Sequence, residues 1–375
     1  MNKKNVIVIM IDGGRLDRAK NSLIFNKLRT KSIFFSQSIT YSPHTIAAMH
    51  AIFSGCYGSR TGTNSYWSTY KFKKDKFKTI TEYLRENNFF TYADVLNQLI
   101  VPKQGFDNYV VHDELNDDLT KRHTKLLTLM NEKFSNGQNY FLYLHYSKIH
   151  TGIMNQVLKV YDNYSDDFFS NKKKNESRYD NLFQEAETYL DEILEKIYQL
   201  NIDKNSIILV MSDHGISVGE KIGERAYGAF CYDYTLRTFS YFLIPNYESK
   251  EITRQIRTID LMPTILDCLE IIPDNNYSNL DGMSLLPLIK DESLPEPYAF
   301  SETGNPLHEK APPKEPNVKS IRTSKWKLIF NEHNNSKELY NLESDPNENQ
   351  NLIGTGEDIE KVLWEELTQL INKND

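Results

Sequence analysis

Three short apolar runs stand out along the chain, at Val6–Ile11, Tyr140–Leu144 and Ser206–Met211. Each run is continuous rather than alternating, and the first is rich in β-branched residues. Continuous runs of this length are typical of parallel strands that are buried on both faces of a sheet. We therefore predict a central sheet that contains these three strands.

Amphipathic segments alternate with these runs. Tyr179–Leu200 has apolar residues every three or four positions, which is the spacing of one helix face. Shorter helices are predicted at Ser22–Thr30, Thr45–Phe53 and Thr79–Asn88. The polar segments Asn163–Ser177 and Thr303–Asn317 are interpreted as loops or insertions. Because strands alternate with helices, the pattern indicates an α/β fold in which helices flank a mixed, mostly parallel sheet.

The C-terminal part of the chain has a different pattern. Lys319–Phe330 and Lys337–Leu342 are predicted to be antiparallel strands, and Glu357–Ile371 is predicted to be a closing helix. We therefore expect two units: a catalytic α/β domain in residues 1–295 and a small subdomain, an antiparallel sheet plus a helix, in residues 296–375.

Composition and charge narrow the class of protein. The chain has 375 residues, of which 39% are apolar and 25% charged, as in globular proteins. Its net charge of −7 disfavours nucleic acid as a partner. The three cysteines are widely spaced, so we expect reduced thiols rather than a disulfide framework. No apolar run approaches the ~20 residues of a membrane span, and we expect a soluble, cytoplasmic protein.

Chemically active side chains follow the predicted strands. Asp12 and His145 come directly after the first and second runs, and Asp213 and His214 come shortly after the third. Because ligands bind beyond the carboxyl ends of parallel strands, these residues are expected to lie together. Two carboxylates and an imidazole are suitable ligands for a divalent metal. The alternatives are that Asp12 caps a helix and that Asp213 and His214 form an ordinary turn.

Thr45 is the first residue of a predicted helix. A hydroxyl at a helix N-terminus lies in a positive local field. A metal held by Asp12 and Asp213 can lower the pKa of such a hydroxyl and make it a nucleophile. An ordinary threonine helix cap gives the same pattern.

The order and spacing of these segments resemble the sulfatase-like family of the alkaline phosphatase superfamily, from residue 5 to about residue 353. The segments that carry the resemblance are Asp12–Asp17, Thr45 with Ser54-Gly55, Arg60 with Gly62, Ser212–Gly215 with Gly219-Glu220, Thr258–Leu269, Leu280–Leu288, Ser324–Ile329, Glu338–Leu342 and Asp345-Pro346. The resemblance implies an ester hydrolase or transferase with Thr45 as nucleophile. It also implies a metal held by Asp12, Thr45, Asp213 and His214.

The threonine departs from the pattern of the family's sulfate-cleaving members. In those enzymes the position is Cys or Ser in a C/S-x-P-x-R context and is oxidised to formylglycine, whereas here Ala47 and Met49 replace the Pro and Arg. Threonine cannot form this aldehyde, whose hydrate releases the sulfated intermediate by elimination. A phosphothreonine is instead released by in-line attack of water or an alcohol. Thr45 therefore favours a phosphate or phosphonate ester as substrate.

Other positions of the family pattern are also altered. The lysine and histidine that usually follow the second strand are absent around Asp94–Gln98, and Tyr227 stands where a His or Lys is common. We therefore expect one divalent metal ion: Mn, Mg, Ca or Zn.

His150 is predicted to bind the ester oxygens or protonate the leaving group, or else to be a structural loop histidine. Arg15 and His145 are predicted to bind substrate, although Arg15 also suits a surface salt bridge.

The expected substrate is a small-molecule or glycan ester. Two other functions remain alternatives to phosphoester cleavage. The first is a sulfate-ester hydrolase that uses Thr45 directly. The second is a non-catalytic relative that binds a ligand or scaffolds a complex.

Overall fold

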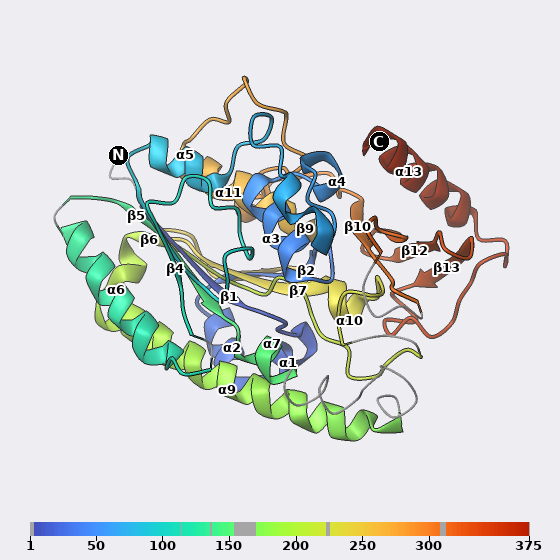
Figure 1. Cartoon of the computed structure of the whole chain (residues 1–375), viewed down its shortest axis with the longest axis horizontal. Coiled ribbons are helices and arrows are strands. Elements are labelled where there is room, and N and C mark those ends of the chain that lie inside the picture. Colours follow the sequence, from blue (N-terminus) through green and yellow to red (C-terminus); the bar gives the residue numbers. More distant parts are fainter. Residues whose placement is uncertain are drawn as a thin grey trace.

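A nine-stranded sheet forms the centre of the computed structural model, which describes residues 4–113, 115–135, 137–153, 170–222, 226–307 and 313–374. The strand order is β4-β3-β5-β1-β6-β7-β2-β8, with β9 also paired to β2 (Figure 1). The strands are β1 (Asn5–Ile11), β2 (Ile33–Ile39), β3 (Phe90–Val95), β4 (Asn108–Val111), β5 (Tyr140–Tyr146), β6 (Ser206–Met211), β7 (Arg237–Leu243), β8 (Lys250–Ile252) and β9 (Ile256–Arg257). Neighbours are parallel except at β7, which is antiparallel to both β6 and β2. The predicted mixed, mostly parallel sheet is confirmed.

The three apolar runs form adjacent strands. β1 lies between β5 and β6, and every residue of the three strands is buried. Their register is regular, with Val8 opposite both Tyr143 and Leu209. Because the three strands are parallel and in register, their carboxyl ends lie together at one edge of the sheet.

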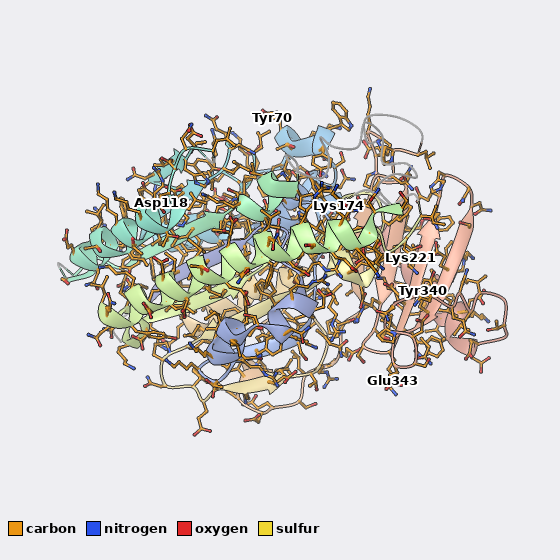
Figure 2. The ribbon with its side chains drawn as sticks, turned by 90° about the horizontal axis from the view of Figure 1, so that it is seen from below. Tyr70, Asp118, Lys174, Lys221, Tyr340 and Glu343 are labelled. Atoms are coloured by element: carbon orange, nitrogen blue, oxygen red, sulfur yellow. The ribbon has the colours of Figure 1, made fainter. Side chains whose placement is uncertain are left out.

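Helices cover both faces of the sheet. One face packs against α1 (Leu16–Asn21), α2 (Leu23–Arg29), α6 (Leu119–Ser135), α7 (Lys148–Gly152) and α9 (Lys172–Gln199), and the other against α3 (Thr45–Ser54), α5 (Ile80–Glu86), α11 (Leu261–Cys268) and α12 (Leu286–Ile289). Short helical turns are α4 (Gly58–Thr61), η1 (Tyr66–Lys71), η3 (Ile202–Lys204), α10 (Asp233–Leu236) and η4 (Thr258–Asp260). Figure 2 shows α9 crossing the first face, with Lys174 near the end that points towards the C-terminal sheet. Within the described ranges, no helix is both long and apolar enough to cross a bilayer.

A second, four-stranded antiparallel sheet lies beside the first (Figure 1). Its strands are β10 (Ala299–Thr303), β11 (Val318–Arg322), β12 (Trp326–Asn331) and β13 (Ser336–Asn341), and α13 (Asp358–Asn374) covers it. Leu363 and Leu367 of α13 are fully buried against Leu328 and Leu339 of the sheet. The predicted small C-terminal sheet with a closing helix is confirmed, whereas a domain boundary between residues 295 and 296 stays a prediction.

A buried set of charges joins the two sheets. Asp233 in α10 pairs with Arg322 of β11 at 2.8 Å and with Lys327 of β12 at 2.9 Å, and Lys327 also pairs with Glu348 at 2.8 Å. We name Asp233, Arg322, Lys327 and Glu348 the interdomain ion cluster. Burial opposes ionisation of Asp233, but the charges of Arg322 and Lys327 outweigh it and lower its pKa. Asp233, Arg322 and Lys327 therefore each have an ionic partner across the two sheets, whereas Glu348 pairs with Lys327 of its own sheet.

Two predicted boundaries were wrong. α9 begins at Lys172, so 172–177 of the predicted loop is helical, while 163–169 lies outside the described residues. Asn175, in this first turn, is buried and donates to the carbonyl of Val218, a tertiary contact that periodicity does not reveal. The predicted strand Lys319–Phe330 is two strands, because the Thr323 hydroxyl accepts the amides of residues 325 and 326 and turns the chain.

Candidate active site

The carboxyl ends of β1, β5 and β6 bring together five of the residues predicted from the sequence. Asp12 follows β1, His145 lies at the end of β5, and Asp213 and His214 follow β6. Thr45, the first residue of α3, completes the group. The ligating atoms of Asp12, Asp213 and His214 lie within 4.8 Å of one another, and all three residues are buried. We call these three residues with Thr45 the catalytic cluster, after the role that we propose for them below.

The hydroxyl of Thr45 points at its neighbours in this cluster. Its Oγ1 lies 3.3 Å from each carboxylate oxygen of Asp12 and 3.2 Å from Nε2 of His214. The N-cap position of α3 belongs to His44, so Thr45 is not the cap of this helix. The amides at the start of a helix surround this oxygen with partial positive charge. The structure thus orients the oxygen of Thr45 towards the carboxylates.

The donor atoms of the cluster fit a divalent cation. The amide of Gly13 donates to Oδ1 of Asp213 at 3.2 Å, whereas Oδ2 is buried with no hydrogen-bond donor in the described part of the chain. The interaction of His214 Nδ1 with the carbonyl of Gly215, at 2.7 Å, makes Nδ1 the protonated nitrogen and leaves the lone pair of Nε2 facing Thr45 and Asp12. An unsatisfied carboxylate oxygen beside an imidazole lone pair is a donor set that a metal ion satisfies.

Electrostatics favour the same conclusion. Burial raises the pKa of Asp213, and the negative charge of Asp12 raises it further. Burial has the same effect on Asp12, but His150, His145 and His214 outweigh it and lower its pKa. Two adjacent buried carboxylates ionise together only when a positive charge lies between them. A divalent cation held by this cluster would supply that charge.

Two further histidines face Asp12, and they differ in exposure. His145 is fully buried, with Nε2 3.1 Å from Oδ2 of Asp12. The side chain of His150, on α7, is 22% exposed, and its Nδ1 lies 3.7 Å from Oδ1 of Asp12. Tyr227 stacks obliquely near His150 and His214, with ring centroids 5.1 and 5.5 Å away. His150 is therefore the more accessible of the two, and substrate binding by His145 stays a prediction.

The structure places Arg15 outside this group. Its guanidinium pairs with Asp17 at 2.9 Å and with Glu220 at 2.5 Å, and it donates to the carbonyl of Ile216 at 2.8 Å. Burial opposes the charge on Arg15, but the two carboxylates raise its pKa. These contacts match the salt-bridge alternative, and substrate binding by Arg15 stays a prediction.

Sequence reasoning missed His44 beside Thr45. Its ring stacks on Tyr66 at 4.3 Å, and burial lowers the pKa of His44 to about 3. His44 is therefore neutral at neutral pH. Its position directly before the helix that begins with Thr45 was the available signal.

A second group of buried ligating residues was also missed. Asp94 lies in β3, His112 directly follows β4, and His123 lies on α6. Their ligating atoms, like those of the catalytic cluster, lie within 4.8 Å of one another. We call them the β3 cluster. The rings of His112 and His145 are 6.4 Å apart, so the two clusters are neighbours.

Hydrogen bonds and charge satisfy the β3 cluster without a metal. Oδ1 of Asp94 accepts from His112 at 2.6 Å and from His123 at 3.3 Å, and Oδ2 accepts from Arg122 at 2.7 Å. The remaining ring nitrogens contact the hydroxyls of Ser147 and Tyr189. Asp94 and His112 lie at the carboxyl ends of strands, as Asp12 does. They were missed because β3 and β4 were not predicted as strands.

Comparison with known proteins identifies the family. The sulfatase family matches residues 4–271, which is more than half of the chain, and a family described as N-sulphoglucosamine sulphohydrolase, C-terminal, matches residues 228–373. The chain belongs to the sulfatase family. Members of this family are ester hydrolases that use a divalent metal, consistent with the catalytic cluster.

Individual relatives are distant. The Δ4,5-hexuronate-2-O-sulfatase of Bacteroides thetaiotaomicron is 25% identical over 169 residues, which are 44% of this chain and 34% of that protein. The match thus spans about a third of the length of this curated relative.

Two solved structures share the fold at 16% identity. One is a complex with its substrate D-glucosamine-2-N,6-O-disulfate (TM-score 0.74, covering 99% and 97% of the two chains), and the other is a phosphonate monoester hydrolase from Silicibacter pomeroyi (TM-score 0.73, 99% and 94%).

Proposed function

We propose that the chain is a metal-dependent hydrolase of phosphate or phosphonate esters with Thr45 as its nucleophile. The observation that carries the proposal is the position of Thr45 Oγ1, 3.3 Å from Asp12 and 3.2 Å from His214. A threonine at this position has no aldehyde through which a sulfated intermediate is eliminated. A phosphothreonine, in contrast, is cleaved by in-line attack of water on phosphorus, which frees the phosphoryl product. An acceptor alcohol in place of water would make the enzyme a phosphotransferase.

The residues of the cluster have separate roles in this proposal. Asp12, Asp213, His214 and the oxygen of Thr45 would hold the divalent ion, which when bound neutralises charge on the ester and favours the ionised hydroxyl. Thr45 Oγ1 forms a bond to phosphorus while the bond to the leaving oxygen breaks. His150 donates a proton to that oxygen, because its partly exposed ring is reachable by substrate. Water then attacks phosphorus while the bond from phosphorus to Thr45 Oγ1 breaks. His150 takes the proton of the water, and the ionised oxygen of Thr45 is restored.

A sulfate ester is the second candidate substrate. The names of the relatives favour it, since the curated protein is a sulfatase and a structural neighbour binds a disulfated sugar. In that case Thr45 would have to transfer sulfate to water without the aldehyde. These relatives also suggest a sugar as the alcohol part of the ester, and a sugar ester is part of our proposal for either reaction.

Hydrolysis of four p-nitrophenyl esters tests these reactions: the phosphate, its phosphodiester, its phosphonate monoester and the sulfate. EDTA-stripped protein would receive each metal in turn, with Thr45→Ala beside wild type and Thr45→Ser as the control that keeps a hydroxyl. We expect metal-dependent phosphoester or phosphonate turnover that Ala abolishes and Ser retains in part. Turnover of the sulfate alone would support the second candidate. Full activity of Thr45→Ala would overturn the role of Thr45, and no turnover of any ester despite bound metal would favour a non-catalytic relative.

A further inference from the structure

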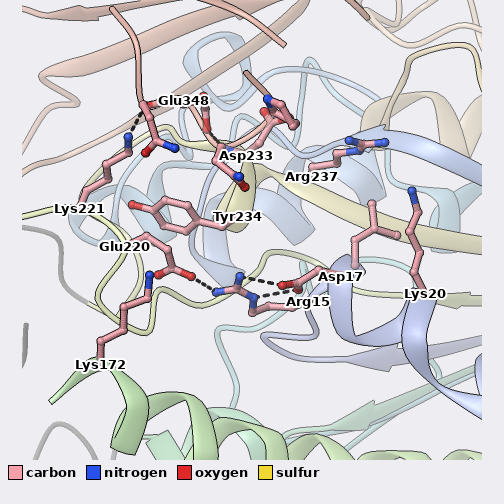
Figure 3. A pocket seen from close by; sticks show the side chains of 14 residues that line it. Arg15, Asp17, Lys20, Lys172, Glu220, Lys221, Asp233, Tyr234, Arg237 and Glu348 are labelled. Carbon is pink, nitrogen blue, oxygen red and sulfur yellow. Dashed lines mark hydrogen bonds and ion pairs between the residues drawn. The ribbon is translucent and has the colours of Figure 1, made fainter. Parts of the chain in front are cut away.

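A pocket of about 400 Å³ lies between the first sheet and the loops of the C-terminal sheet (Figure 3). Its wall contains Arg15 and Lys20 from the α1 region, Glu220 from the loop after His214, and Arg237 at the start of β7. Arg15 follows Asp12 by three residues, so their Cα atoms are at most about 11 Å apart. The pocket is thus close to the catalytic cluster, but it contains none of the cluster's residues.

The carboxylates that line the pocket already have partners. Asp17 and Glu220 flank the guanidinium of Arg15, as the dashed lines in Figure 3 show. Asp233 and Glu348 belong to the interdomain ion cluster, where Arg322 and Lys327 neutralise them. These acidic groups therefore form no ion pair within 4 Å with Lys20, Lys172 or Arg237, and their charges are shared with other cations.

Four cations in the wall have no carboxylate partner among the described residues: Lys20, Lys172, Lys221 and Arg237. Lys221 donates to the backbone carbonyl of Glu348 and lies over the ring of Tyr232, which leaves Lys20, Lys172 and Arg237 to face a ligand. Arg237 donates from Nε and Nη2 to the carbonyl of Ser36, at 3.1 and 2.9 Å, which gives no ionic compensation. The charges of Asp233 and, less strongly, Glu251 act on Arg237, and Glu251 also acts on Lys20. Asp233 is already paired with Arg322 and Lys327, and Glu251 is paired with Arg29 at 2.5 Å. Burial lowers the pKa of Lys20, and the charge of Arg237 lowers it further. The pocket is therefore positively charged.

We propose that this pocket binds an oxyanion of the sulfate or phosphate type between Lys20, Lys172 and Arg237. Unpaired cations in a recessed surface attract and concentrate anions, and guanidinium and ammonium groups are the usual ligands of such oxyanions. The oxyanion is either a free inorganic ion or a second anionic group on a substrate whose ester bond lies at the catalytic cluster. The proposal stands whether or not that cluster cleaves phosphoesters.

Calorimetric titration of the full chain with inorganic sulfate and phosphate, in chloride buffer, tests binding. The protein is used with its metal and again with EDTA. Without the metal, the catalytic cluster presents two carboxylates and repels anions, whereas the pocket draws its charge from the protein itself. Binding that persists in EDTA is therefore expected, and the absence of sulfate or phosphate binding in either state would overturn the proposal.

Paired substitutions locate the site. Lys20→Gln with Lys172→Gln removes two of the three ligand-facing cations, and we expect at least a tenfold loss of affinity. The matched control is Lys27→Gln with Lys174→Gln, two exposed lysines on α2 and α9 outside the pocket. The control is expected to change affinity less than twofold. Equal losses in both variants would show only a general effect of net charge and would overturn the assignment.

Sugar ligands separate the two sources of the oxyanion. Glucose 6-sulfate and glucose 6-phosphate would be titrated beside the inorganic ions, with glucose as the uncharged control. Tighter binding of the charged sugars than of the free ions would indicate a substrate subsite. Equal binding would indicate an inorganic ion site. Either assignment holds only if the variant Lys20→Gln with Lys172→Gln loses affinity for the ligand and the control variant does not.

Discussion

Two buried groups of Asp and His residues lie side by side at one edge of the sheet, and they differ in how their charges are balanced. In the β3 cluster, Asp94 receives hydrogen bonds on both oxygens, and Arg122 supplies a positive charge. In the catalytic cluster no lysine or arginine among the described residues pairs with Asp12 or Asp213, and one oxygen of Asp213 has no donor. The residue types are alike, so we infer that the unsatisfied charge makes the group of Asp12, Asp213 and His214 the candidate metal site and leaves the β3 cluster a structural network.

The largest expected effect is on metal binding. Asp213→Asn removes one of the two carboxylate charges of the cluster. We expect metal affinity to fall by at least about 100-fold, since even outer-shell partners of a metal are worth about 10- to 100-fold. Calorimetry and elemental analysis of the purified protein measure affinity and stoichiometry. Asp94→Asn is the matched control and should keep the wild-type metal content. Loss of one metal equivalent in Asp94→Asn would show that the two clusters do not differ in this way.

The next effect is on stability. Here Asp94→Asn is expected to have the larger effect, whereas Asp213→Asn has the larger effect on metal affinity. Asp94→Asn leaves Arg122 without its buried partner, and we expect a loss of about 3 kcal/mol in the free energy of unfolding. Urea denaturation of metal-free protein at pH 7 measures it. Asp213→Asn removes repulsion from Asp12 and should cost much less. A more destabilised Asp213→Asn would contradict the comparison.

The pH dependence of stability gives a related test. Burial opposes ionisation of Asp94, but hydrogen bonds from His112 and His123 outweigh it and lower its pKa. The same carboxyl in the unfolded chain has a pKa of about 3.9. The stabilisation from ionised Asp94 is therefore complete above that value and is lost progressively as the pH falls from it towards the lower pKa of the folded state. The gap in unfolding free energy between wild type and Asp94→Asn, measured by denaturation, should therefore be full at pH 7 and smaller at about pH 3.5. An unchanged gap at the lower pH would exclude the ionised form as the source of stability.

Metal addition should stabilise the fold through one cluster alone. At a free metal concentration 100 times the dissociation constant, we expect about 2.7 kcal/mol. Thermal melts with and without EDTA measure this as a shift of the midpoint. The shift should disappear in Asp213→Asn and persist in Asp94→Asn, and a shift that depends on Asp94 would place the metal in the β3 cluster.

The smallest expected effect concerns a single hydrogen bond. Tyr189→Phe removes the hydroxyl that contacts Nδ1 of His123 at 2.7 Å. We expect a loss of about 1 kcal/mol in unfolding free energy and no change in ester turnover. A drop in turnover without a change in stability would instead mean that the β3 cluster positions catalytic residues.

The sequence predicted the catalytic cluster because strand ends place its residues together. β1, β5 and β6 are buried on both faces and are read as unbroken apolar runs, so Asp12, His145 and Asp213 were found at once. The fold class follows from the same runs. This part of the prediction needs only local information and the geometry of parallel strands.

The β3 cluster could not be predicted in the same way. β3 has polar residues within it, and β4 is short and partly exposed, so neither gives a continuous apolar run. Asp94 and His123 are far apart in sequence and meet only because α6 packs across the sheet. The partners of Arg15 were likewise set by tertiary contacts, since Glu220 belongs to the loop after β6.

The interdomain ion cluster has a consequence for how the chain can be divided. A fragment that ends near residue 295 would keep Asp233 and lose Arg322 and Lys327, which would leave a buried carboxylate without a counter-charge. A fragment that begins there would keep two buried cations without their carboxylate from α10. Neither half is a self-sufficient module that recombination could move to another gene. The two sheets are therefore expected to be inherited, and expressed, as one unit.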